Sequence, residues 1–187
     1  DRAGVPLRNS YLSAYEPNNG KFWWRADAQF EDEPEDKSTY GFLGPPVPFG
    51  ELLLVAAGGD DRLWLCALEQ ETGELAWRTM LCEYSKWGAS PWSSPAVAVS
   101  GGEAYVATSA GLVFALDASD GQMLWATQYQ RAELEDRIRR DLLLRGKHFT
   151  SGFDEDYLFV HQNQLVVLPA DGEMMFALDR GNGRLRW

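Results

Sequence analysis

One sequence pattern, an alanine, an acid, a glycine and a tryptophan at fixed spacing, occurs four times along the chain. Its clearest copy is the segment 111–125, GLVFALDASDGQMLW. In every copy the alanine precedes the glycine by six residues, the acid precedes it by four, and the tryptophan follows it by four. A pattern repeated in this way indicates an architecture in which each copy forms one structural unit. The copies contain Gly20, Gly73, Gly121 and Gly183, followed by Trp24, Trp77, Trp125 and Trp187.

Each copy of the pattern predicts a β-hairpin. Apolar residues lead into a short polar turn that closes on the glycine, and a second strand then carries the tryptophan. Glycine suits this turn because it adopts a positive φ angle without steric cost. Apolar stretches between the hairpins predict further strands: Leu52–Ala57 in the second repeat, Pro95–Ser100 and Ala104–Thr108 in the third, and Tyr157–Val160 and Leu165–Leu168 in the fourth.

The spacing of the copies predicts an all-β fold, a partial β-propeller of four-stranded antiparallel blades. Successive glycines are 53, 48 and 62 residues apart, and one propeller blade takes roughly 40–50 residues. We therefore divide a single domain, residues 1–187, into a half blade (1–29) and three blades (30–80, 81–129 and 130–187). An arc of about three and a half blades exposes an apolar sheet face at each end. We expect further polypeptide or another chain to complete the ring.

The pattern Ala-Leu-Asp-x-x-x-Gly-x-x-x-Trp resembles the quinoprotein-type (PQQ-like) propeller repeat. The resemblance covers all four copies, and the chain looks most like the bacterial outer-membrane assembly (BamB-like) propellers. It implies that the four repeat tryptophans dock between neighbouring blades and that the protein is periplasmic or otherwise extracytoplasmic. The first copy departs from the pattern, because Tyr15-Glu16-Pro17 stands in place of Leu-Asp.

Composition and charge bound the possible partners. The formal net charge is −11, from 28 acidic and 17 basic residues, and an acidic surface repels the phosphate backbone of nucleic acid. The apolar runs are much shorter than the roughly 20 residues of a membrane-spanning helix. Cys66 and Cys82 are expected too far apart on the second hairpin for a disulfide, so both are predicted to be free and buried thiols.

Extra residues in three connections between blades are candidates for an interaction face. Trp87 and Trp92 lie in the connection between the second and third repeats. Arg137 and Arg140 lie in the next connection, where apolar residues spaced every four positions predict a helix over 131–147. The first connection contains the acidic run 31–36. Structural alternatives remain for each: a solvated loop for the acidic run, a cap over a local apolar patch for the helix, and loop anchors for the two tryptophans.

Two functional classes fit these observations. The favoured one is a non-catalytic propeller that binds proteins or acts as a scaffold, without a cofactor. The alternative, from the resemblance, is a quinoprotein dehydrogenase that holds pyrroloquinoline quinone (PQQ) and calcium. Those dehydrogenases commonly carry an adjacent cysteine pair, which this sequence lacks. His148 and His161 do not form a His-rich metal motif, and 154–156 (Asp-Glu-Asp) has no evident nucleophile or base partner, so no catalytic, cofactor or metal residue is assigned.

Overall fold

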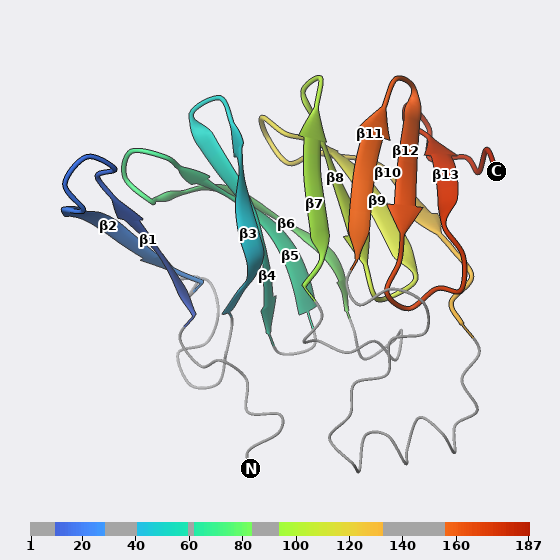
Figure 1. Cartoon of the computed structure of the whole chain (residues 1–187), viewed down its shortest axis with the longest axis horizontal. Helices are drawn as coiled ribbons and strands as arrows, with labels where there is room; N and C mark the ends of the chain where they lie inside the picture. The colour runs from blue at the N-terminus through green and yellow to red at the C-terminus, as the bar shows by residue number, and fades with distance from the viewer. Residues whose placement is uncertain (1–9, 29–40, 60–61, 84–93, 133–155) are drawn as a thin grey trace, which may run out of the picture.

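The computed structural model describes residues 10–28, 41–59, 62–83, 94–132 and 156–187, which form four antiparallel sheets arranged as an open fan (Figure 1). Each sheet contains one copy of the repeat, and we number these blades one to four in chain order. Blade one holds β1 (Tyr11–Tyr15) and β2 (Phe22–Asp27); blade two holds β3 (Gly41–Phe49), β4 (Leu52–Gly59), β5 (Arg62–Glu69) and β6 (Leu75–Glu83). Blade three holds β7 (Ala96–Ser100), β8 (Glu103–Thr108), β9 (Leu112–Asp117) and β10 (Met123–Gln128); blade four holds β11 (Tyr157–His161), β12 (Gln164–Leu168) and β13 (Phe176–Asp179).

The strands predicted from the apolar stretches are confirmed as β4, β7, β8, β11 and β12, each within two residues of the expected bounds. Trp24, Trp77 and Trp125 lie on β2, β6 and β10, the last strands of their sheets. The part of the chain that the structure describes contains strands and turns but no helix. The predicted helix over 131–147 lies outside this part apart from its first two residues, which have no regular secondary structure.

The strand β3 was not among the predicted strands, and its sequence is rich in proline. Pro45, Pro46 and Pro48 cannot donate backbone hydrogen bonds, which normally argues against a strand. The structure accommodates them because β3 is the edge of its sheet and its register with β4 shifts between Leu43 and Val47. Gly44 in this irregular stretch has φ +84°, and its α-carbon faces the Ser94 hydroxyl so closely that a side chain there would overlap it.

All four repeat turns have the same backbone geometry. In each, the glycine N–H donates to the carbonyl of the acid four residues earlier, at 2.8–2.9 Å, and the acid N–H donates across the turn to the residue after the glycine. The four glycines have φ between +69° and +75°, a region in which other residues are strained. The first copy, despite Pro17, therefore folds as the other three do. The acids are Glu16, Glu69, Asp117 and Asp179.

Each repeat tryptophan that precedes another described blade packs on the turn glycine of that blade. The ring of Trp24 lies against Gly73, that of Trp77 against Gly121, and that of Trp125 against Gly183. A β-carbon on any of these glycines would overlap the ring. Glycine is therefore required at these positions for two reasons. It adopts the positive φ of the turn, and it has no side chain in the space that the indole fills.

The hydrophobic cores lie between the sheets and not within a single one. One cluster joins blades one and two, a second joins blades two and three, and a third joins blades three and four. The second and third strands are the most buried, as in the fully inaccessible Leu54, Leu65 and Val106. The first strands are less buried, and β7 contacts both β3 and β11, so these strands line the inner side of the fan.

Blade four differs from the expected four-stranded sheet. Its fourth element is an isolated bridge between Leu178 and Leu185, and Trp187 follows that bridge. Trp187 nevertheless continues the pairing with β13, because the Ala177 N–H donates to its carbonyl at 2.9 Å. Trp187 is thus placed opposite Ala177, as Trp125 is placed opposite Ala115 and Trp77 opposite Ala67.

Candidate functional site

The described residues that flank the three connections between blades lie along one edge of the fan, the lower edge in Figure 1. The chain leaves and re-enters there at residues 28 and 41, 83 and 94, and 132 and 156. The repeat turns lie at the opposite edge. The described ends of the equivalent connections therefore share one edge, which is the arrangement on which the interaction-face prediction depends.

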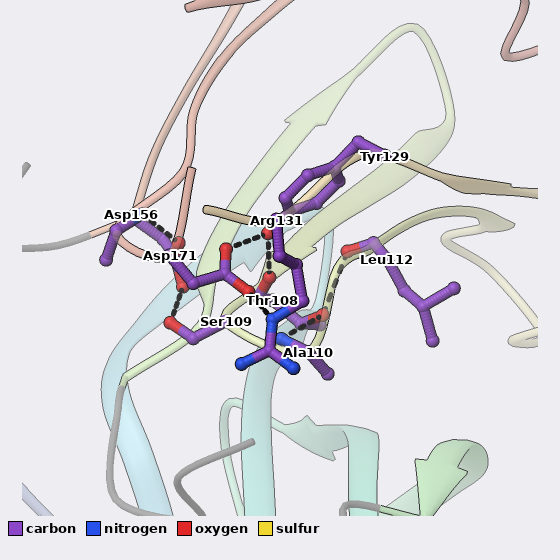
Figure 2. A network of polar contacts seen from close by, with 9 residues as sticks. Thr108, Ser109, Ala110, Leu112, Tyr129, Arg131, Asp156 and Asp171 are labelled. Carbon is purple, nitrogen blue, oxygen red and sulfur yellow. Dashed lines mark hydrogen bonds and ion pairs between the residues drawn. The ribbon is translucent and has the colours of Figure 1, made fainter. Parts of the chain in front are cut away.

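The candidate residues of that face, Trp87, Trp92, Arg137 and Arg140, lie outside the described residues, as do the acidic run 31–36 and His148. Their assignment stays a prediction. The structure does describe the two ends of the connection between blades three and four. Residues at these ends contact two neighbouring turns, which contribute Ser109 and Asp171. Together they form a polar cluster that we call the connection base: Ser109, Tyr129, Arg131, Asp156 and Asp171 (Figure 2).

Asp171 holds the outgoing end of the connection. Its Oδ2 accepts a hydrogen bond from Nε of Arg131 at 2.6 Å, within an ion pair, and its backbone carbonyl accepts from the Ala132 N–H at 2.8 Å. The Tyr129 hydroxyl lies 2.5 Å from both Oδ1 of Asp171 and the carbonyl of Thr108. That hydroxyl has one proton for two acceptors, so both contacts are hydrogen bonds only when Asp171 is protonated.

Asp156 holds the returning end of the connection. It precedes β11 and is buried, with 6% of its surface exposed. Its Oδ2 accepts from the Ser109 hydroxyl at 2.8 Å, and its Oδ1 accepts from the Ala170 N–H at 2.8 Å. Ser109 belongs to the turn between β8 and β9, so this carboxyl joins blade four to blade three.

The buried polar residues of the described part are all in or beside this cluster: Thr108, Ser109 and Asp156. Burial raises the pKa of Asp156 to about 6, against the lowering effect of its two hydrogen bonds. Burial also raises the pKa of Asp171, although Tyr129 and Arg131 oppose the shift. The pKa of Tyr129 is raised by burial and then by the neighbouring Asp171. The connection base is therefore a place where protonation and folding are coupled.

The contacts of this cluster stabilise the fold, because they hold the two ends of the connection in place. A raised carboxyl pKa is typical of general acids, but a general acid must reach its substrate. Both oxygens of Asp156 are engaged inside the protein. Nothing in the sequence indicated a partner for Asp156, which precedes β11, and the structure shows it as a buried link between blades. Its side-chain partner Ser109 is 47 residues away in sequence, so no local signal could have identified the cluster.

A second polar contact joins blades three and four at the opposite edge. The Arg180 guanidinium donates from Nε to the Tyr105 hydroxyl at 2.6 Å and to Oε2 of Glu103 at 3.2 Å, and from Nη2 to the Ser100 carbonyl at 2.5 Å. Tyr105 and Glu103 are themselves hydrogen-bonded. Burial and the Glu103 contact raise the pKa of Tyr105 to about 12. Gly101 permits this arrangement, since a β-carbon there would overlap the guanidinium.

The cysteines are free and buried, as predicted. Cys66 pairs across the hairpin with Arg78, and the register of this hairpin shifts between Ala67 and Leu68. Cys82 lies near the end of β6, opposite Leu63 of β5. Burial raises the thiol pKa to about 12 for Cys66 and about 11 for Cys82. Both are therefore unreactive thiols of the core.

The comparisons with known proteins agree with this architecture. The family model described as outer membrane protein assembly factor BamB matches residues 8–187. The chain belongs to this family. No curated protein matched the chain. Its tryptophan-on-glycine repeats are thus those of a BamB-like, PQQ-type propeller.

Solved structures show the same fold. BamB from Moraxella catarrhalis aligns with a TM-score of 0.62 and 22% identity, covering 96% of this chain and 43% of that one. The quinohemoprotein alcohol dehydrogenase from Comamonas testosteroni aligns with a TM-score of 0.62 and 20% identity, covering 97% and 32%. The quinohemoprotein alcohol dehydrogenase ADHIIG from Pseudomonas putida HK5 aligns with a TM-score of 0.60 and 17% identity, covering 94% of this chain and 31% of that one. The chain spans less than half the length of these proteins, and the likeness shows the fold alone.

The alternative functional class requires a site for a quinone and a calcium ion. Such a site needs stacking partners, cations for the quinone carboxylates and oxygen ligands for calcium. In residues 10–28, 41–59, 62–83, 94–132 and 156–187, no group of three or more His, Cys, Asp or Glu is placed to hold a metal ion. The inner strand β7 carries small apolar residues, and His161 is exposed at the end of β11. Within the same residues, no helix has the length and apolar character needed to cross a membrane.

Proposed function

We propose that this chain is a non-catalytic BamB-like propeller that binds protein partners as part of an extracytoplasmic assembly. The observation that supports this most is the use of the buried polar groups. In the described part, these groups form hydrogen bonds and an ion pair that hold the two ends of the connection between blades three and four. Polar groups placed in this way are engaged in holding the connection in position, so among the described residues these buried groups are not directed at a substrate.

The partner surface in this proposal is the edge that carries the connections. Trp87, Trp92, Arg137 and Arg140 are its first candidates, since tryptophan and arginine are the residues that most often dominate protein interfaces. The connection base would present the segment between blades three and four from a rigid foundation. The acidic charge of the whole chain favours a protein partner over nucleic acid.

A crosslinking experiment tests the surface. A photoreactive residue in place of Trp87 or Arg137 is expected to crosslink a discrete protein in bacterial envelope extract, and the adduct should disappear when the remaining three candidates are changed to alanine. The matched control places the same photoreactive residue at Leu124, an exposed apolar side chain of β10. Equal adducts from the candidate positions and from position 124 would refute the assignment of this surface.

A second experiment tests the absence of a cofactor. The purified protein is mixed with PQQ and calcium, and dye-coupled oxidation of alcohols and aldoses is measured. We expect neither stoichiometric quinone binding nor turnover. Quinone binding with turnover would instead favour a quinoprotein dehydrogenase, the class that two of the similar structures represent.

A further inference from the structure

The Tyr129 hydroxyl lies between two acceptors that belong to different blades. It is 2.5 Å from the carbonyl oxygen of Thr108, the last residue of β8 in blade three. It is also 2.5 Å from Oδ1 of Asp171, which lies between β12 and β13 in blade four (Figure 2). A phenol has one proton to donate. If Asp171 is ionised, the hydroxyl can therefore bond to only one of these two oxygens.

A proton on Asp171 satisfies each of these contacts. The carboxyl then donates from Oδ1 to the Tyr129 oxygen, and the Tyr129 hydroxyl donates to the Thr108 carbonyl. The other carboxyl oxygen, Oδ2, accepts from Nε of Arg131 at 2.6 Å whether or not the proton is present. The positions of these atoms therefore correspond to a protonated Asp171.

The charged and titratable groups around Asp171 in the described part come from two other segments. Tyr129 and Arg131 follow β10, and Asp156 precedes β11; the turn between β8 and β9 contributes uncharged side chains. Tyr129 keeps its own proton, because burial and the neighbouring Asp171 raise its pKa. The proton that is gained or lost between Tyr129 and Asp171 is therefore that of the carboxyl.

Burial raises the pKa of Asp171, against the opposing effects of Tyr129 and Arg131. A carboxyl whose pKa is raised by folding stabilises the folded state when it is protonated, and this contribution is lost as pH rises through the folded value. The carboxylate that remains still pairs with Arg131 and accepts from Tyr129. The bond that is lost is the one between Tyr129 and the carbonyl of Thr108, a residue without exposed surface.

We propose that Asp171 is a proton-operated switch that determines whether Tyr129 is bonded to blade three as well as to blade four. When Asp171 is protonated, Tyr129 accepts from Asp171 and donates to Thr108. When Asp171 is ionised, Tyr129 donates to Asp171 alone, and the end of β10 is released from the end of β8. Acidification thus strengthens the site at which the connection between blades three and four begins. The switch depends neither on the proposed partner surface nor on the absence of a cofactor.

Carbon NMR of the protein with labelled aspartate and tyrosine tests the switch. We expect the Cγ signal of Asp171 to titrate above the ordinary aspartate pKa of about 3.9. The Cζ signal of Tyr129 should shift along the same curve, although Tyr129 itself stays protonated. Each signal is assigned by its absence from Asp171→Asn or Tyr129→Phe. In Asp171→Asn the amide NH2 donates to Tyr129 as the protonated carboxyl does, so the Tyr129 signal should stay at its low-pH position throughout.

Amide hydrogen exchange measures the consequence for the end of β10. The Tyr129 N–H donates to the Gly111 carbonyl at 2.9 Å. After correction for the intrinsic pH dependence of exchange, its protection should fall about fivefold between about pH 4 and about pH 8, as the bond to Thr108 is lost. Asp171→Asn should keep the high protection at both pH values, and Tyr129→Phe should have the low protection at both.

Two carboxyl variants serve as controls. Glu173→Gln changes an exposed acid of the same segment between β12 and β13 and should leave the Tyr129 curve unchanged. Asp156→Asn removes the other buried carboxyl, and the Tyr129 signal should still titrate. A Tyr129 signal that does not follow Asp171, that still titrates in Asp171→Asn, or that stops titrating in Asp156→Asn would overturn the proposal. An Asp171 carboxyl that titrates at or below its ordinary pKa would also overturn it.

Discussion

The junction between blades two and three and the junction between blades three and four share one docking contact. In both, an indole ring covers a turn glycine, Gly121 or Gly183. In both, a threonine two residues after the tryptophan donates to the carbonyl of that glycine at 2.7 Å. The two threonines are Thr79 and Thr127; blade one has Ala26 at this position and makes no such bond.

The two junctions differ in their polar surroundings. Nε1 of Trp125 donates to the Arg180 carbonyl at 3.0 Å, whereas Nε1 of Trp77 is buried without a hydrogen-bond partner in the described part of the chain. The junction between blades three and four also has the Arg180 contacts and the Ser109–Asp156 bond. The position before the first strand is Asp156 in blade four and Pro95 in blade three. Repetition thus supplies the docking contact, and residues particular to one blade supply the additional polar links.

The largest expected effect comes from filling a docking position. Gly121→Val would push a branched side chain into the Trp77 ring and strain a φ of +75°. We expect the free energy of unfolding to fall by about 4 kcal/mol, measured by urea denaturation. Gly183→Val should cost a similar amount, because the docking contact is common to both junctions. The control Gly102→Val carries the backbone strain without the overlap, and an equal loss there would contradict this explanation.

The second prediction concerns pH and separates the two junctions. Folding raises the pKa of Asp156 from 3.8 to about 6, so the folded protein binds the additional proton between these values. The free energy of unfolding should therefore fall as pH rises from about 4 to about 6, by roughly 2–3 kcal/mol from this group. In Asp156→Asn the amide oxygen can accept from the Ala170 N–H while the amide NH2 donates to the Ser109 hydroxyl, so both contacts persist without a titrating group and the slope should flatten.

The measurement for this prediction is urea denaturation at several pH values. Glu173→Gln, a change at an exposed acid of the same blade, is the control and should leave the slope unchanged. An unchanged slope in Asp156→Asn would show that the buried carboxyl is not what couples protonation to folding at the junction between blades three and four.

A smaller difference is expected between two matched tryptophan variants. Trp125→Phe leaves the Arg180 carbonyl without its indole donor, whereas Trp77→Phe removes an N–H that has no described partner. Both lose a similar ring area, so Trp125→Phe should reduce the free energy of unfolding by about 1.5 kcal/mol more. Equal losses in denaturation experiments would mean that the indole hydrogen bond contributes nothing to the junction.

The smallest effect is expected from the Arg180 side chain. Arg180→Met removes the bonds to Ser100, Glu103 and Tyr105 and should cost about 1 kcal/mol, less at high salt because Arg180 and Glu103 are partly exposed. Arg184→Met, at an exposed arginine of the same turn, is the control. A salt-independent loss would show that packing of the side chain, and not its charge, holds the two blades together.

The sequence by itself determined the hairpins, their turns and the placement of the tryptophans. These features depend on residues close together in the chain: alternating apolar positions, a glycine able to adopt a positive φ, and a fixed offset from alanine to tryptophan. The Trp-x-Thr pair at 77–79 and 125–127 was equally visible in the sequence and was missed. The strand β3 was not predicted, and its prolines are acceptable because it lies at the edge of the sheet.

Only the tertiary structure decided which polar residues meet between blades. Asp156 contacts Ser109 from 47 residues away, and Arg180 contacts Ser100 from 80 residues away. Neither pair leaves a periodic or local signature, and the burial of Asp156 follows only from the packing of blade four on blade three. Local sequence fixes how each hairpin folds because it sets backbone conformation within a few residues. Burial, pKa and the partners of a charged group depend on where separate hairpins come together.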